Sequence, residues 1–216
     1  MKTDADLKKD VTDELAWDPS VRSNAIGVSV KDGVVTLTGH IETFAEKQAA
    51  MRAVRRVADV KAIALELDVK LAPSHQRSDT DIAANAKQAL KWNSVVPADA
   101  VRLTVDHGWI TLQGELDWDY QRRAAEKAVR VLLGVVGVSN EMTLRARAKV
   151  ADLNRRIEEA LTRQAVREAH RVRVEVDGST VRLQGKVHSW AERDVVQGVA
   201  WSAPGVQNVV NEVLIE

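Results

Sequence analysis

The sequence predicts an α+β protein made of three tandem copies of one unit, each with the element order α-β-β-α-β. Each unit is expected to form a three-stranded mixed sheet with two helices packed on one face. Three observations lead to this prediction. The copies align over residues 6–69, 81–144 and 152–215 without insertion or deletion. Apolar residues in each copy follow first helical and then strand periodicity. The same glycine, valine and glutamate positions recur in all three copies.

The repeat boundaries define the expected domain organisation. Domain 1 covers residues 1–70, domain 2 covers 81–144 and domain 3 covers 152–216. The linkers between them are residues 71–80 and 145–151. Each unit is close to the lower size limit for a domain that folds alone, so contacts between the units are expected to add burial.

The first element of each copy is predicted to be a helix. In domain 1, Leu7, Val11 and Leu15 have the i, i+4, i+8 spacing of a single buried stripe. Each copy also starts with an aspartate in the predicted first turn, where a carboxylate is favoured by the positive end of the helix dipole. We therefore expect a structural role for this position, which is Asp6, Asp81 and Asp152.

A β-hairpin is predicted after this helix. Its first strand alternates apolar and other residues, and Asp32-Gly33 suits a tight turn whose central residues need positive φ. The second strand carries a repeated glycine on its inward-facing side. A close approach of two backbone segments, or a local bend, is the expected reason. We assign a structural role to these glycines, which are Gly39, Gly114 and Gly185.

The second helix lies between two strands and carries small apolar residues on one face, which predicts close packing on the sheet. Its start in domain 1 is a capping box, Thr43-x-x-Glu46. Domain 2 has Trp118 at the cap position, so Asp117 or Asp119 is expected to cap the helix with a shifted start.

Composition excludes several classes of function. Lysine plus arginine and aspartate plus glutamate both number 31, so the basic excess of a nucleic-acid-binding protein is missing. There is no cysteine for a disulfide, a thiolate nucleophile or a metal site. No apolar stretch is long enough for a transmembrane segment. We expect a cytoplasmic protein without cofactor or nucleic-acid partner, or a periplasmic one if a signal peptide has been removed.

Histidine placement argues against catalysis. The five histidines occupy no equivalent positions in different copies, and they fall in a linker, at turns and near element ends. None has metal-ligand spacing, and no nucleophile has an evident base. We therefore predict no catalytic residue, no metal site and a non-enzymatic protein.

A repeated glutamate is the candidate site for a cation. It alternates with buried residues on the last strand, so it is expected on the polar face of the sheet. Hard cations take several oxygen ligands, and no aspartate-rich loop accompanies this position. Solvated strand residues or inter-domain contacts are the alternative interpretation. The residues are Glu66, Glu141 and Glu212.

Six tryptophans stand out beside one phenylalanine and one tyrosine. Trp17 and Trp92 are equivalent, at the end of the first helix of domains 1 and 2. Lys87 and Lys91 have i, i+4 spacing beside Trp92, as on a helix that contacts lipid. These four residues are the candidates for lipid or partner binding. Packing between domains is the alternative role for the tryptophans.

The unit resembles the BON domain, named for bacterial osmotically induced and nodulation proteins. The matching segments are Val-x-Val-x-Asp-Gly-Val-Val-Thr-Leu-Thr-Gly at 28–39 and Pro-Gly-Val-x-Asn-Val-Val-Asn-Glu-Val at 204–213, with Gly134-Val135 and Val138-Ser139-Asn140-Glu141 in domain 2. The resemblance implies a non-enzymatic, transport- or stress-associated protein. Some members of the family are thought to bind phospholipid, and some cytoplasmic relatives have been linked to potassium.

Three functional hypotheses follow. The first is a scaffold in osmotic or envelope stress that recognises phospholipid or an envelope-associated component. The second is binding of a monovalent cation, potassium in particular. The third is a protein–protein interaction module. The sequence does not define the oligomeric state, the specific ligand, the trigger or the relative orientation of the domains.

Overall fold

The computed structural model describes residues 2–145, 153–163 and 172–215. Domain 1 contains α1 (Asp4–Trp17), β1 (Ile26–Lys31), β2 (Val34–Ile41), α2 (Phe44–Arg56) and β3 (Ala62–Val69). Domain 2 contains α3 (Asp79–Trp92), β4 (Val101–Asp106), β5 (Trp109–Leu116), α4 (Asp119–Val129), β6 (Gly137–Asn140) and β7 (Thr143–Leu144). Domain 3 contains α5 (Leu153–Arg163), β8 (Val172–Asp177), β9 (Thr180–Val187), α6 (Trp190–Ser202) and β10 (Asn208–Ile215).

The predicted α+β fold is confirmed in all three domains. The second strand is central in each sheet, where it pairs antiparallel with the first strand and parallel with the last. The parallel pair requires a crossover, which the second helix supplies. In domain 2 the last strand is interrupted, and both of its pieces, β6 and β7, pair with β5.

Each domain has its own apolar core between the sheet and its two helices. In domain 1 the predicted stripe Leu7, Val11 and Leu15 is buried, and so are Ala50 and Ala53 on the opposing helix. The small side chains of α2 allow this helix to lie close to the sheet, as predicted. The cores of domains 2 and 3 use the equivalent positions.

The helix starts show why the repeated aspartates are there. Asp6 N donates to Thr3 Oγ1 at 3.2 Å, and Thr3 Oγ1 donates to Asp6 Oδ2 at 2.7 Å. Ser78 and Asp81 repeat this reciprocal cap in domain 2. The predicted structural role therefore holds for both aspartates. The third, Asp152, and most of the second linker lie outside the described residues.

The repeated strand glycines are required by a close backbone approach, as one of the two predicted reasons stated. Gly39 has φ +127°, and a Cβ there would stand 2.2 Å from the carbonyl oxygen of Ala25. Gly114 has φ +143°, with the carbonyl oxygen of Ala100 at 2.0 Å. Gly185 has φ +138°. A side chain at Gly39 or Gly114 would clash with the short turn that precedes the edge strand of its domain.

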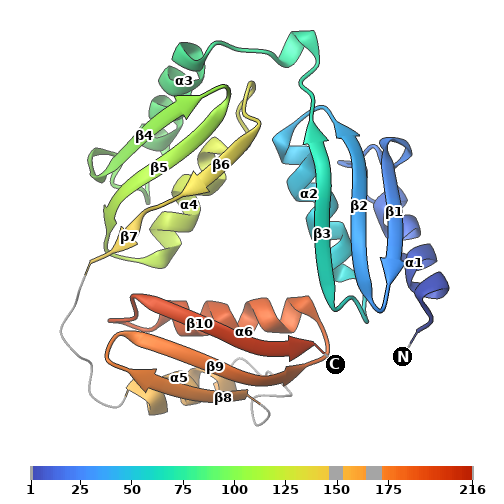
Figure 1. The fold of residues 1–216 in the computed structure, drawn as a ribbon. Coiled ribbons are helices and arrows are strands. Elements are labelled where there is room, and N and C mark those ends of the chain that lie inside the picture. The colour runs from blue at the N-terminus through green and yellow to red at the C-terminus, as the bar shows by residue number, and fades with distance from the viewer. Residues whose placement is uncertain (1, 146–152, 164–171, 216) are drawn as a thin grey trace.

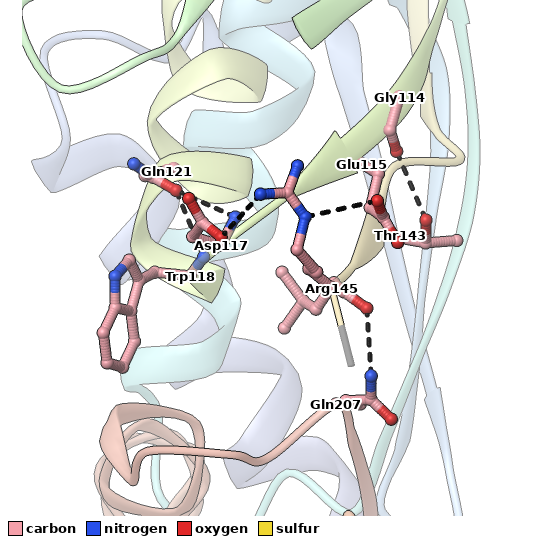
Figure 2. Close-up of polar contacts among 9 residues, drawn as sticks. Gly114, Glu115, Asp117, Trp118, Gln121, Thr143, Arg145 and Gln207 are labelled. Carbon is pink, nitrogen blue, oxygen red and sulfur yellow. Dashed lines mark hydrogen bonds and ion pairs between the residues drawn. The ribbon is translucent and has the colours of Figure 1, made fainter. Parts of the chain in front are cut away.

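The start of α4 differs from the prediction. Trp118 itself is the N-cap residue, and neither neighbouring aspartate caps the helix. Instead, Gln121 Oε1 accepts hydrogen bonds from the backbone N–H groups of Asp117 and Trp118, at 3.2 and 3.1 Å (Figure 2). The side chain of this first-turn glutamine therefore accepts from backbone N–H groups that precede the helix and takes the place of an aspartate cap. Asp119 is then available for other contacts.

The three domains are arranged at the corners of a triangle, with α2, α4 and α6 turned toward its centre (Figure 1). Both α2 and α4 pack on α6. The contacts run head to tail. The end of α2 meets the start of α6, and the end of α6 meets the start of α4. Phe44, at the start of α2, packs against the core of domain 2. The three domains therefore contact one another pairwise and form a closed ring.

Candidate functional site

A groove of about 710 Å³ lies between helix α3 and the edge strand β4 of domain 2. Apolar side chains from both elements line it, including Leu90 and Leu103. Three basic residues, Lys87, Lys91 and Arg102, and one acidic residue, Asp99, also line it. The groove therefore combines an apolar surface with a local excess of positive charge, which suits a molecule with an anionic head and an apolar tail.

The structure thus brings together two of the predicted binding residues, Lys87 and Lys91, and adds one that sequence reasoning missed. Arg102 is on the exposed side of β4, where strand alternation alone suggests an ordinary solvated residue. Only the packing of α3 along β4 places it beside the two lysines. The pairing of β4 with β5 on one side leaves its other edge open toward this helix.

Domains 1 and 3 do not repeat this charge pattern. In domain 1, the positions equivalent to the three basic residues carry no positive charge: they are Thr12, Ala16 and Gly27. In domain 3 they carry one negative and one positive charge: they are Glu158, Thr162 and Arg173. The basic groove is therefore specific to domain 2, although the fold beneath it is shared.

Trp92 and Trp17 lie at the ends of α3 and α1 and are strongly exposed. Their relative exposures are 80% and 83%. Neither belongs to the apolar clusters that join the domains, so inter-domain packing does not account for them. Trp92 directly follows Lys91 beside the groove, whereas Trp17 has no such basic neighbours on its helix end.

Two other tryptophans do pack between domains, as the alternative interpretation predicted. The indole Nε1 of Trp190 donates to the carbonyl oxygen of Val60 in domain 1 at 2.8 Å. The guanidinium of Arg55 lies 4.9 Å from its ring centroid. Trp201 packs against the cores of both domain 2 and domain 3. Four of the six tryptophans therefore form a strongly exposed pair and a junction pair.

Glu66 and Glu212 lie on the exposed side of β3 and β10, whereas Glu141 is exposed in the interruption between β6 and β7 and not on a strand as predicted. Glu141 Oε2 accepts from Gln113 Nε2 at 2.8 Å. Glu212 accepts from Gln184 Nε2 at 2.8 Å and is paired with Arg182. The hydrogen bond from Gln184 and the charge of Arg182 lower the pKa of Glu212. A cation at Glu212 would compete with Arg182, so cation binding by these residues stays a prediction.

In the described part of the chain, no three histidine, cysteine, aspartate or glutamate side chains gather as a metal site would need. Within the same residues, no helix has the length and apolar composition to cross a bilayer.

Domains 2 and 3 also meet next to the second linker. Gln207 Nε2, which precedes β10, donates to the carbonyl oxygen of Leu144 at 3.3 Å (Figure 2). Arg145 is held beside this contact by Glu115 and Asp117, each at 3.4 Å. The basic residue at the end of β7 is therefore engaged by carboxylates of its own domain.

These features define a class of protein: a tandem-repeat α+β chain in which one small domain is used three times and its surfaces are differentiated. The BON domain profile matches residues 3–70, 78–146 and 149–216. The chain therefore belongs to the BON domain family, as its sequence motifs indicated.

The relative and the two solved structures compared with this chain share less than a third of its residues. The chain is 27% identical over 127 residues to the osmotically inducible protein Y of Escherichia coli strain K12. The match covers 57% of this chain and 63% of the relative, slightly less than two thirds of its length. Two solved structures of CdsD, a structural protein of the type III secretion system of Chlamydia trachomatis, also align. They share 14% and 13% identity, cover 100% and 98% of this chain and 100% and 92% of their own, and each has a TM-score of 0.27.

Proposed function

We propose that this protein is a non-enzymatic binding protein of osmotic or envelope stress that associates with anionic phospholipid through domain 2. The observation that carries the proposal is the basic, apolar groove between α3 and β4. Its volume of about 710 Å³ lies in the usual range of ligand sites. Similarity to an osmotically inducible protein supports the stress-related setting.

The chemistry of the groove matches the two parts of a phospholipid. Lys87, Lys91 and Arg102 attract the phosphate, because basic side chains near an anionic surface each contribute favourable electrostatic energy. The apolar lining accepts part of an acyl chain. Trp92 has an apolar ring with one polar N–H group, which suits the boundary between headgroups and chains.

A vesicle sedimentation experiment tests this proposal. We expect the purified protein to bind vesicles of phosphatidylglycerol and phosphatidylcholine at low salt, and to be released as salt screens the charges. Lys87→Glu combined with Lys91→Glu should remove most of the binding. Trp92→Ala should weaken it, by roughly tenfold if the ring is fully inserted.

The repeat supplies a matched control. Trp17→Ala removes an equally exposed tryptophan from domain 1, where none of the three positions equivalent to Lys87, Lys91 and Arg102 is basic. This variant should bind vesicles as the unchanged protein does. Failure of the unchanged protein to bind at low salt, or equal losses from Trp17→Ala and Trp92→Ala, would show that the domain 2 groove is not a lipid site.

A further inference from the structure

A second pocket, of about 550 Å³, lies where α4 of domain 2 meets α6 of domain 3. It is separate from the α3–β4 groove, so it concerns an activity beyond lipid association. Trp201 forms one wall, with the guanidinium of Arg122 4.7 Å from its ring centroid. The volume is that of a small-molecule site.

The pocket exists because domain 2 departs from the repeat at the start of its second helix. The first residue of this helix is Phe44 in domain 1 and Trp190 in domain 3, and each packs against the core of the neighbouring domain. In domain 2 the equivalent residue is Asp119. The space that an aromatic side chain occupies at the other two junctions is therefore left to smaller, polar groups.

A glycine enlarges the same space from the other side. Gly198 is inside helix α6 and lines the pocket. Its equivalents are Arg52 and Lys127, both long side chains. A Cβ at Gly198 would meet no atom within 4 Å. Crowding at the Cβ therefore does not require glycine here, and it is the absence of a long side chain at this position that keeps the pocket open.

One side of the pocket presents arginine. Asp119 is only 2% exposed and accepts from Arg122 Nε at 3.1 Å. Arg123 Nε lies 2.7 Å from Asp119 Oδ2, but this oxygen has no well-oriented hydrogen bond. A guanidinium has five N–H donors. Arg123 can therefore bind an anionic group in addition to its contact with the buried carboxylate.

The opposite charge is present in the same pocket. Glu126 lines it and accepts from Asn140 Nδ2 at 3.0 Å. A carboxylate can accept further hydrogen bonds through its remaining lone pairs. Asp194 also lines the pocket but is paired with Arg55 at 2.7 Å. Glu126 is therefore the carboxylate best placed to receive a cationic group.

We propose that the pocket between α4 and α6 binds a small zwitterion, a molecule with a carboxylate held by Arg123 and an ammonium group held by Glu126. Single anions and single cations satisfy only one side of the pocket. A zwitterion engages both sides, so that each of its own charges meets an opposite charge in a partly enclosed site.

Ligand-observed nuclear magnetic resonance with a matched set of probes tests the ligand class. The probes are δ-aminovalerate, which has both charged groups, valerate and pentylamine, which each have one. We expect δ-aminovalerate to bind, and each single-charge probe to bind roughly tenfold more weakly, since each loses one charged hydrogen-bonding contact.

Two substitutions at one position test the location. Gly198→Arg restores the residue type of domain 1 and should fill the pocket and abolish binding. Gly198→Ala should leave binding intact. Both should raise the melting temperature, because both residues favour helix over glycine, so loss of binding in the arginine variant cannot be attributed to misfolding.

The possible results separate cleanly. Binding of δ-aminovalerate that Gly198→Arg removes and Gly198→Ala keeps supports the proposal. The proposal is wrong if the unchanged protein binds none of the probes, if valerate or pentylamine binds as tightly as δ-aminovalerate, or if Gly198→Arg still binds. None of these results depends on whether the protein binds vesicles.

Discussion

Helix α6 contacts a neighbouring domain at each end, and the two contacts use the same chemical pair. At its start, Trp190 packs into domain 1 under the guanidinium of Arg55. At its end, Trp201 packs into domain 2 under the guanidinium of Arg122. Domain 3 supplies the tryptophan at both junctions. Two tryptophans on one helix therefore supply two of the three junctions in the ring.

The junctions at the two ends of α6 differ in how completely side chains fill the space between the domains. Trp190 closes its junction and uses its indole N–H in a hydrogen bond to Val60. The other junction has Asp119 where an aromatic residue would stand, and a pocket remains. One end of α6 is therefore a structural contact, and the other end combines a contact with an open polar site.

The largest effect is expected from Trp201→Ala. Trp201 packs against the cores of domains 2 and 3, and truncating a well-packed tryptophan costs about 3 kcal/mol. Urea unfolding followed by far-ultraviolet circular dichroism measures this loss. Trp92→Ala is the matched control, since it removes an exposed ring. Equal stabilities of the two variants would mean that Trp201 does not hold the junction.

Trp190→Ala should cost somewhat less but change the shape more. Lost burial and the lost bond to Val60 together amount to about 2 kcal/mol. Domains 1 and 3 are joined by no direct linker, so this contact is what closes the ring on that side. We expect the radius of gyration from small-angle X-ray scattering to increase. An unchanged value would contradict closure by Trp190.

Substituting Arg55 or Arg122 compares the two junctions of α6 in more detail. Arg55→Ala should cost about 1 kcal/mol, from a cation–π contact and a partly exposed ion pair with Asp194. Arg122→Ala should cost more, about 1.5 kcal/mol, because it also removes a hydrogen-bond partner from the buried Asp119. Adding Asp119→Asn to Arg122→Ala should recover part of the difference. If it recovers none, the extra cost does not come from the buried carboxylate.

Much of the fold follows from the sequence because the constraints on it are local and repeated. Helix stripes such as Leu7, Val11 and Leu15, the capping box at Thr43 and the glycine at position 39 each identify an element without reference to the rest of the chain. Because the same pattern occurs in three copies, it identifies helices and strands that one copy alone would leave ambiguous.

The functional surfaces depend on contacts between elements that are distant in the sequence. Local sequence patterns do not predict such contacts. Lys87 and Lys91 could be grouped because they share a helix face, but Arg102 joins them only through packing of α3 on β4. The α4–α6 pocket is harder still to predict from the sequence, since its walls come from two domains. Its one signal in the sequence is the departure from the repeat at Asp119 and Gly198.

The smallest effect is expected from Asp194→Asn at the closed end of α6. Asp194 pairs with Arg55 at 2.7 Å, with side-chain exposures of 50% and 29%. Such a partly exposed pair contributes about 0.5 kcal/mol and is screened by salt. The difference in urea stability between the two proteins should therefore shrink as sodium chloride is raised, whereas the cost of Trp190→Ala should persist. A salt-independent loss in Asp194→Asn would mean that Asp194 stabilises the junction by packing, and that both ends of α6 are held by burial alone.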